Sequence, residues 1–132
     1  MGNVLEGGCL CGALRFAVKD ETIWCAHCHC HMCQKAHGAG YVTWVGVANR
    51  RFSITRGDAA LRWFDSSPGA QRGFCRICGS SLFFRSSRWQ GEMHITLANF
   101  DGPIDRQPQG HVNYSSHVEW MPVDESLPIK AD

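Results

Sequence analysis

Residues 75–79 of the chain read Cys75-Arg-Ile-Cys78-Gly79, a motif in which two residues separate a pair of cysteines and a glycine follows. In a knuckle of this type two thiolates converge on one metal ion, and the glycine permits a tight turn whose backbone N–H groups can face sulfur. The knuckle supplies only half of a tetrahedral zinc site. The other two ligands must come from elsewhere in the chain.

A second pair of cysteines, in Cys9-Leu-Cys11-Gly12, lies near the start of the chain. Apolar residues recur at every second position over residues 10–18, which predicts a strand whose other face carries these cysteines. Sulfurs at positions i and i+2 of a strand point the same way. We therefore predict a structural zinc site, here called the four-cysteine site, made of Cys9, Cys11, Cys75 and Cys78. Because zinc would close a long loop there, loss of one ligand is expected to unfold the protein.

The middle of the chain holds a third group, Cys25-Ala-His-Cys28-His-Cys30-His-Met-Cys33. Cys28 and Cys30 share one face of a predicted strand over residues 22–30, and Cys33 follows after a short turn. These three thiols, here called the three-cysteine site, are predicted to bind a second zinc and to leave its fourth position open, as in catalytic zinc sites. Strand parity places Cys25 on the opposite face as a packed thiol. With Cys25 as a fourth ligand, the site would be closed and the argument for catalysis would fail.

Histidines surround this third group at positions 27, 29, 31 and 37. Parity turns His27 and His29 away from the cysteines of the same strand, which favours a role in orienting ligands or simple exposure to solvent. His31 and His37 lie in the turn region, where parity makes no prediction. They are candidates, beside water, for proton transfer to a substrate.

The overall composition is that of a globular protein, since 44% of the 132 residues are hydrophobic, 19% are charged and the formal net charge is +1. This length predicts one domain over residues 1–132. The scattered basic residues predict neither a nucleic-acid nor a membrane partner. The first residues lack the features of a secretory signal, so we expect a cytoplasmic protein. In that reducing compartment clustered cysteines bind metal more often than they form disulfides, which favours two Zn²⁺ sites over free thiols.

Short segments of period two, separated by turn-like sequences, predict several strands. Residues 41–47 are apolar on both faces, which suits a central strand. Residues 32–38 predict a turn or a single helical turn. Further strands are expected over residues 52–55, 61–65, 81–85, 93–97 and 111–113. Because no long segment has a helical period, the predicted fold is mainly β with one or two short helices.

In these motifs the chain resembles the family of glutathione-dependent formaldehyde-activating enzymes, which also includes centromere protein V. The matching segments are residues 8–16, 28–35, 72–80, 111–120 and 124–128. The resemblance implies an Mss4-like fold of stacked small antiparallel sheets held by zinc, with a structural ion at the four-cysteine site and an exchangeable one at the three-cysteine site. The chain departs from the family pattern at Cys25, an extra thiol, at Gln34 and at Glu119.

The family's activity implies carbon–sulfur lyase chemistry, in which S-hydroxymethylglutathione is formed from glutathione and formaldehyde or cleaved to them. In this hypothesis a thiol at the open zinc position is deprotonated and attacks the aldehyde carbon. Glutathione carries carboxylates, so cationic and aromatic side chains are expected along its approach. Proximity to the motifs suggests Lys35, Trp44, Arg72 and Trp120, each of which could equally be a surface charge or a core aromatic.

Two other classes of function remain open from the sequence. A non-catalytic, zinc-stabilised binding module predicts a closed second site that includes Cys25. A thiol redox or zinc-buffering protein predicts that the middle cysteines release zinc on oxidation. The sequence makes no prediction of the oligomeric state.

Overall fold

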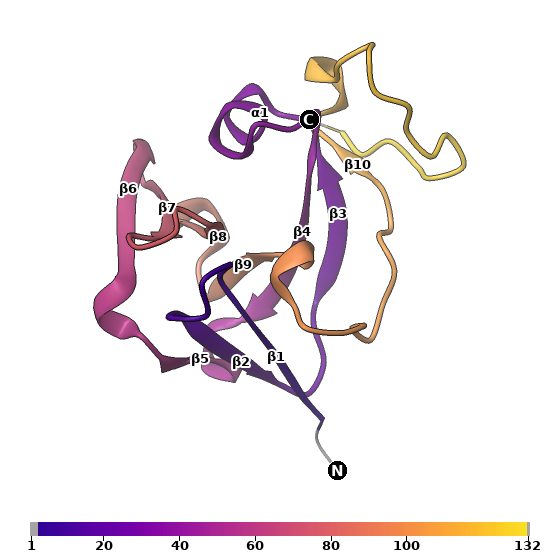
Figure 1. The fold of residues 1–132 in the computed structure, drawn as a ribbon. Coiled ribbons are helices and arrows are strands. Elements are labelled where there is room, and N and C mark those ends of the chain that lie inside the picture. Colours follow the sequence, from indigo (N-terminus) through magenta and orange to yellow (C-terminus); the bar gives the residue numbers. More distant parts are fainter. Residues whose placement is uncertain (1–2, 132) are drawn as a thin grey trace.

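The computed structural model describes residues 3–131, which form two β-sheets, one α-helix and five short 3₁₀ turns (Figure 1). The smaller sheet is antiparallel and has the strand order β1 (Val4–Gly8), β2 (Arg15–Lys19), β5 (Phe52–Arg56). Residues 1, 2 and 132, the ends of the predicted domain, lie outside the described residues. Within residues 3–131 no helix has the length and apolar character that crossing a lipid bilayer requires.

The larger sheet has seven strands, all antiparallel to their neighbours except for one parallel pair at its edge, between β10 and β3. In order across the sheet the strands are β10 (His111–Val112), β3 (Trp24–Cys28), β4 (Val42–Ala48), β9 (Glu92–Thr96), β8 (Ser81–Ser86), β7 (Ala70–Cys75) and β6 (Leu61–Ser67). The helix α1 (His31–His37) connects β3 to β4. The 3₁₀ turns are η1 (Asn49–Arg51), η2 (Asp58–Ala60), η3 (Ser87–Trp89), η4 (Leu97–Asn99) and η5 (Tyr114–Ser116).

These elements confirm the prediction of a mainly β fold with small antiparallel sheets and a short helix. The segment expected to form a central strand is β4, which is almost wholly buried and pairs with a strand on each side. The expected helical turn is α1, which begins after Cys30 and ends at Gly38, whose positive φ of 61° suits the left-handed cap of a helix. The five shorter predicted strands all overlap observed ones, namely β5, β6, β8, β9 and β10.

Two strands, β1 and β7, were not predicted from the sequence, because each has a glycine where it makes its closest contact. In β1, a Cβ on Gly7 would lie 2.1 Å from the carbonyl oxygen of Asn99, so only glycine fits where the two sheets meet. In β7, a Cβ on Gly73 would lie 3.0 Å from the ring of Trp63 on β6. Glycine weakens the period-two signal that identifies a strand.

The prediction of a strand over residues 10–18 was wrong in its first half, and the strand predicted over residues 22–30 is too long. Residues 9–14 form the loop of the β1–β2 hairpin, in which the Cys9 N–H donates to the Leu14 carbonyl at 3.0 Å. β3 ends at Cys28, and Cys30 is the N-cap of α1. Both segments have period two in sequence, but a tight turn and a helix cap interrupt the extended backbone.

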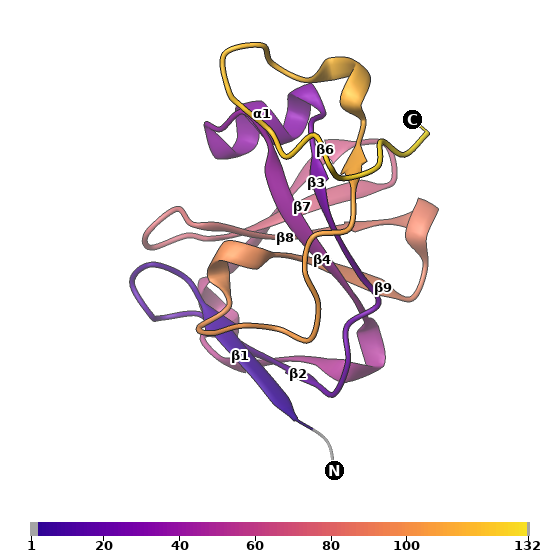
Figure 2. The same ribbon diagram turned by 90° about the vertical axis from the view of Figure 1, so that its right-hand side faces the viewer.

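The main core lies between the two sheets and is filled by apolar side chains of both. Phe16 of β2 contacts Phe83 of β8 edge-on at a centroid distance of 5.6 Å. A smaller apolar cluster is separate from it and consists of Cys28, Cys33, Val42 and Trp44. Figures 1 and 2 both show α1 and the yellow C-terminal segment at the end of the molecule opposite β1 and β2. The smaller cluster therefore lies under that end.

Candidate metal centres

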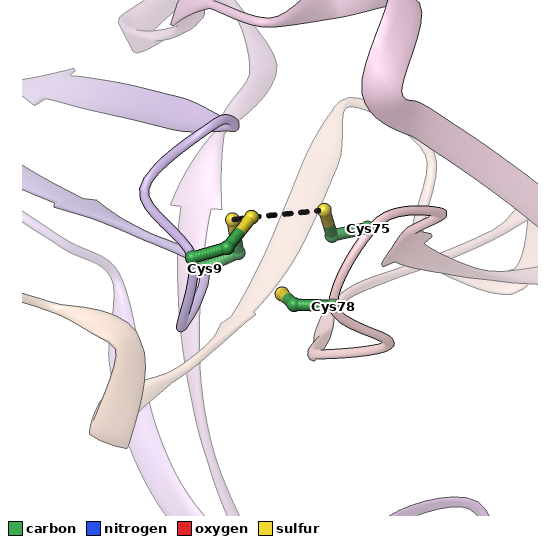
Figure 3. Close-up of side chains that lie close together, drawn as sticks. Cys9, Cys75 and Cys78 are labelled. Carbon is green, nitrogen blue, oxygen red and sulfur yellow. Dashed lines mark hydrogen bonds between the residues drawn. The ribbon is translucent and has the colours of Figure 1, made fainter.

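Two loops far apart in the sequence bring the four-cysteine site together. Cys9 and Cys11 lie in the β1–β2 loop, whereas Cys75 ends β7 and Cys78 lies in the loop that follows it. All four sulfurs lie within 4.8 Å of one another, with 3.6 Å between Cys9 and Cys11 and 3.9 Å between Cys11 and Cys75. Figure 3 shows the sulfurs of Cys9, Cys75 and Cys78 turned toward a common centre.

Each of these loops is a knuckle closed by a glycine in the left-handed region. Gly12 has a φ of 80° and donates its N–H to the Cys9 carbonyl at 3.1 Å. Gly79 has a φ of 79° and donates to the Cys75 carbonyl at 2.8 Å. A residue with a Cβ would be strained at either position, which explains a glycine directly after the second cysteine of each pair.

The three-cysteine site forms where β3 ends and α1 begins. Cys28 is the last residue of β3, Cys30 is the N-cap of α1, and Cys33 lies in its first turn. Their sulfurs also lie within 4.8 Å of one another, with 3.6 Å between Cys28 and Cys33. The Cys33 N–H donates to the Cys30 sulfur at 3.3 Å, so this thiol takes the place of the usual oxygen cap. Local chain geometry thus brings all three sulfurs to one point.

Both groups have donor sets and spacings that fit a metal ion of zinc type. Zinc binds thiolates at about 2.3 Å in a tetrahedron, which places neighbouring sulfurs roughly 3.8 Å apart. Three of the sulfur–sulfur distances, Cys9–Cys11, Cys11–Cys75 and Cys28–Cys33, are 3.6 to 3.9 Å and agree with that spacing, and the others are within 4.8 Å. Among residues 3–131, one group has four cysteine ligands and the other has three.

Side-chain N–H groups from three separate elements donate to the sulfurs of the three-cysteine site. Trp44 of β4 donates its indole N–H to Cys33 at 3.4 Å, and Arg72 of β7 donates its Nη2 to the same sulfur at 3.5 Å. Asn113, which follows β10, donates its Nδ2 to Cys28 at 3.3 Å. Donors of this kind favour the thiolate and fix the direction in which each sulfur faces.

The protons of the three thiols are strongly coupled. Hydrogen bonds from Cys28 and then Cys33 lower the pKa of Cys30 to about 2, and the charge of Arg72 acts in the same direction. Hydrogen bonds with Cys30 and then with Cys33, together with burial, raise the pKa of Cys28 far above its ordinary value. Like charges so close together resist further ionisation. A cation at their centre would remove that resistance.

Cys25 belongs to neither group and lies in the main core. It is fully buried, and this burial raises the pKa of its thiol to about 11. The thiols of the three-cysteine site pack instead in the smaller cluster. In the described part of the chain no fourth cysteine, histidine or carboxylate closes the three-cysteine site.

The histidines of this region make their hydrogen bonds away from the three sulfurs. His27 bonds through Nδ1 to the Thr43 hydroxyl at 2.8 Å, as expected from strand parity. His29 is fully buried and bonds through Nε2 to Nδ1 of His111, whose Nε2 donates to the Asp124 carbonyl. Burial lowers the pKa of His29 to about 4. These contacts connect β3 to the C-terminal segment.

The two candidates for proton transfer differ in position. His31 is exposed at the first residue of α1. His37 is half-buried at the last residue, with its ring edge-on to Trp44 at a centroid distance of 5.4 Å. Burial, then the charge of Arg72, lowers the pKa of His37 to about 4. Trp44 thus contacts both His37 and the Cys33 sulfur.

Of the four side chains suggested for a substrate approach, Trp44 and Arg72 contact the three-cysteine site. Lys35 and Trp120 are exposed, and within residues 3–131 no hydrogen bond, ion pair or ring contact connects them to the sulfurs. The sequence analysis missed Asn113. Asn113 has a positive φ of 54°, which asparagine tolerates better than most residues. An asparagine at the end of a short predicted strand was therefore the available sign of a turn at this position.

A family model described as glutathione-dependent formaldehyde-activating enzyme matches residues 4–116, which include both groups of cysteines. The chain belongs to this family. The resemblance expected from the three cysteine motifs is thereby confirmed.

Named relatives agree with this membership. A protein of Halomonas elongata, named as a candidate glutathione-dependent formaldehyde-activating enzyme, is 29% identical over 92% of this chain and 82% of its own length. An uncharacterized lyase of Schizosaccharomyces pombe is 28% identical over 74% of this chain and 69% of its own length. At the level of the family, the prediction of a lyase-type enzyme is confirmed.

A solved structure has the same fold. The crystal structure of a Rhodobacter sphaeroides protein superimposes with a TM-score of 0.64 at 24% identity, covering 76% of this chain and 92% of the other. This likeness supports the arrangement of the strands.

Proposed function

We propose that the protein is a zinc-dependent carbon–sulfur lyase that acts on a thiol–aldehyde adduct of the S-hydroxymethylglutathione kind, in the cytoplasm. The proposal includes a structural zinc at the four-cysteine site and an exchangeable zinc at the three-cysteine site. One observation carries it: three sulfurs converge where β3 meets α1, and no fourth ligand closes the group within residues 3–131. A site with three protein ligands leaves one position for the substrate.

The metal, when bound, would polarise the substrate sulfur and favour its thiolate form. The chain's own residues would hold Cys28, Cys30 and Cys33 in one orientation through the N–H donors described above. Trp44 and the apolar side chains of the smaller cluster exclude water from the buried sides of the sulfurs. Electrostatic interactions in such a dry site are stronger than they would be in water.

The geometry favours His37 over His31 for exchanging a proton with the adduct oxygen. His37 lies against Trp44, which itself contacts Cys33, whereas His31 faces solvent. A proton-transfer group must lie within hydrogen-bond reach of its target, directly or through one water. We therefore assign this role to His37, whose neighbour Trp44 donates to a sulfur of the site.

Glutathione is the thiol that the family name suggests for this chain. The carboxylates of glutathione lie several bonds from its sulfur. Lys35 is an exposed cation on α1, the helix that carries Cys33. Trp120, 72% exposed in the C-terminal segment, offers an apolar surface. Both remain proposed contacts of the tripeptide.

The decisive test is Cys30→Ser, with Cys25→Ser as the matched control. Because Cys30 belongs to the open site, its loss should leave a folded chain with one zinc and reduce turnover of S-hydroxymethylglutathione by at least about 10³-fold. Cys25 lies outside both groups, so its variant should keep two zinc ions and its turnover. Zinc would be counted by native mass spectrometry, and turnover followed by release of formaldehyde.

Other outcomes would favour the competing functions. Unchanged turnover in the Cys30 variant would rule out the catalytic assignment. A second zinc bound by all four middle cysteines, without turnover in the wild type, would indicate a binding module. Reversible zinc release by peroxide, again without turnover, would indicate a redox or buffering protein.

A further inference from the structure

Arg72 is a buried cation beside the three-cysteine site. It lies on β7 opposite Phe84 of β8, with only 9% of its surface exposed. Its guanidinium carbon lies 5.2 Å from the centre of the Phe84 ring, and its Nη2 lies 3.5 Å from the Cys33 sulfur. An aromatic ring and a thiol thus surround a charge that is largely removed from water.

The guanidinium of Arg72 is incompletely satisfied. Its Nε and Nη1 are buried and have no hydrogen-bond partner, and no carboxylate within residues 3–131 forms an ion pair with it. Arg15, Arg51 and Arg106 each pair with an aspartate on the surface. A buried guanidinium without a carboxylate partner is costly, and each unmade hydrogen bond adds to the cost. Two N–H groups beside the site sulfurs therefore still lack an acceptor, which an anionic oxygen would supply.

We propose that Arg72 forms an anion subsite of the three-cysteine site, which receives a negatively charged oxygen located close to the sulfur of a bound thiol ligand. The proposal rests on the proposed function, because it takes the thiol site as given. Since Nη2 lies 3.5 Å from the Cys33 sulfur, the guanidinium lies directly beside the sulfurs of the three-cysteine site. The carboxylates of glutathione lie several bonds farther away and would bind elsewhere.

In the proposed reaction that oxygen belongs to the adduct. When the adduct forms, a sulfur lone pair makes the S–C bond, the π pair of the aldehyde moves to oxygen, and the resulting alkoxide takes up a proton. In the cleavage direction the hydroxyl loses its proton, the C=O bond re-forms, and sulfur leaves with the S–C pair. Arg72 would stabilise the alkoxide in both directions by charge and by hydrogen bonds.

A binding experiment isolates this role from catalysis. The three-cysteine site would be loaded with Co²⁺, and the thiolate-to-metal absorption band titrated with mercaptoacetate and with ethanethiol. Both probes offer a thiol, but only mercaptoacetate carries an anionic oxygen near it. The ratio of their affinities should fall by about 10- to 100-fold in Arg72→Gln, the worth of a charge-assisted hydrogen bond. Arg72→Lys, which keeps the charge and loses the planar fork, should give an intermediate ratio.

The matched control is Arg85→Gln. Arg85 lies on the neighbouring strand β8, where its guanidinium stacks on Trp63 at 3.8 Å and its Nε donates to Gln71, away from the sulfurs. This variant should keep the wild-type ratio. If either Arg72 variant binds both thiols more weakly by the same factor, Arg72 only balances the charge of the thiolates and the subsite proposal is wrong. An unchanged affinity for each thiol also refutes it.

Turnover provides a second readout and separates the two proposals. With S-hydroxymethylglutathione, metal-loaded Arg72→Gln should lose about 10²- to 10³-fold in kcat, with a smaller change in KM. If the wild type turned over no adduct, the lyase proposal would fail. The ratio of thiol affinities would still decide whether Arg72 binds an anionic oxygen.

Discussion

The two groups of cysteines use the same ligand in opposite surroundings. The four-cysteine site joins two loops and includes one exposed and one half-buried cysteine, Cys11 and Cys78. The three-cysteine site lies within its own apolar cluster, with two of its three cysteines buried. The site with the complete ligand set is thus the more exposed of the two. A closed metal centre needs no protection from water, whereas an open one depends on the surrounding side chains to exclude it.

The hydrogen bonds to sulfur differ in the same way. At the four-cysteine site the hydrogen-bond partners of the sulfurs are close in sequence: the Leu14 N–H donates to Cys9, and the Ser80 hydroxyl bonds with Cys78. The bond with Ser80 lowers the pKa of the Cys78 thiol to about 5. At the three-cysteine site Trp44 and Arg72 reach sulfur from other strands. The four-cysteine site is thus surrounded by groups of its own loops, whereas paired strands position the donors around the three-cysteine site.

The largest effect is expected for a ligand of the four-cysteine site. Cys75→Ser should leave the chain without a cooperative fold at 25 °C, because structural zinc contributes ~10–16 kcal/mol in small finger peptides, as much as a domain's net stability. Far-ultraviolet circular dichroism and the dispersion of amide NMR signals would test this.

Cys25→Ser controls for the same chemical change at a buried position without metal. It should lose only about 1–3 kcal/mol, the cost of a buried hydroxyl without a partner. A folded Cys75 variant with full zinc content would contradict the structural role of the four-cysteine site.

A smaller effect is expected for the donors around the open site. Trp44→Phe removes the indole N–H from Cys33 and should weaken zinc binding there by about 10- to 100-fold, leaving the four-cysteine site unchanged. Competition with a chromogenic chelator should then show one ion lost earlier and the other retained.

Trp24→Phe is the matched control for this substitution. Trp24 lies on the adjacent strand β3 and donates its N–H to Glu92 at 3.1 Å instead of to sulfur. Its variant should keep the wild-type affinity at both sites. Equal weakening by the two variants would mean that packing, and not the hydrogen bond to sulfur, controls the metal.

The smallest expected effect concerns the pKa of His37, which lies against Trp44 near the three-cysteine site. Burial and Arg72 lower this pKa to about 4, so the ring should stay neutral between pH 5 and pH 7. Because the folded-state pKa lies below the unfolded one, the contribution of His37 to stability is complete above about pH 6.5 and is lost as the pH falls toward 4. NMR titration of the ring protons would measure it. A value near 6.5 would show that water reaches the ring freely.

Much of the fold could be read from patterns of side chains. β4 was predicted because its side chains are apolar on both faces, and β2 because apolar and polar side chains alternate along it. In both strands the side chains indicate which faces are buried. β1 and β7 were not, because at Gly7 and Gly73 the decisive feature is the lack of a side chain beside a distant partner. Likewise, the extended backbone expected at Cys9 and Cys30 gives way to a knuckle and a helix cap.

By itself the sequence determined how the eight cysteines are grouped: two separated pairs and a run of four between residues 25 and 33, of which three lie within six residues. Within each pair and within the run the spacing is local, so turns and caps suffice to orient those thiols, whereas the two pairs meet only through the tertiary structure. Only the tertiary structure decided what surrounds them, since Asn113 lies 85 residues from Cys28, and Arg72 39 residues from Cys33. These contacts depend on which strands pair and in what register, and that is settled by packing across the whole sheet. The cysteine groups that could hold metal ions follow from the sequence, and the surroundings of the three-cysteine site follow from the fold.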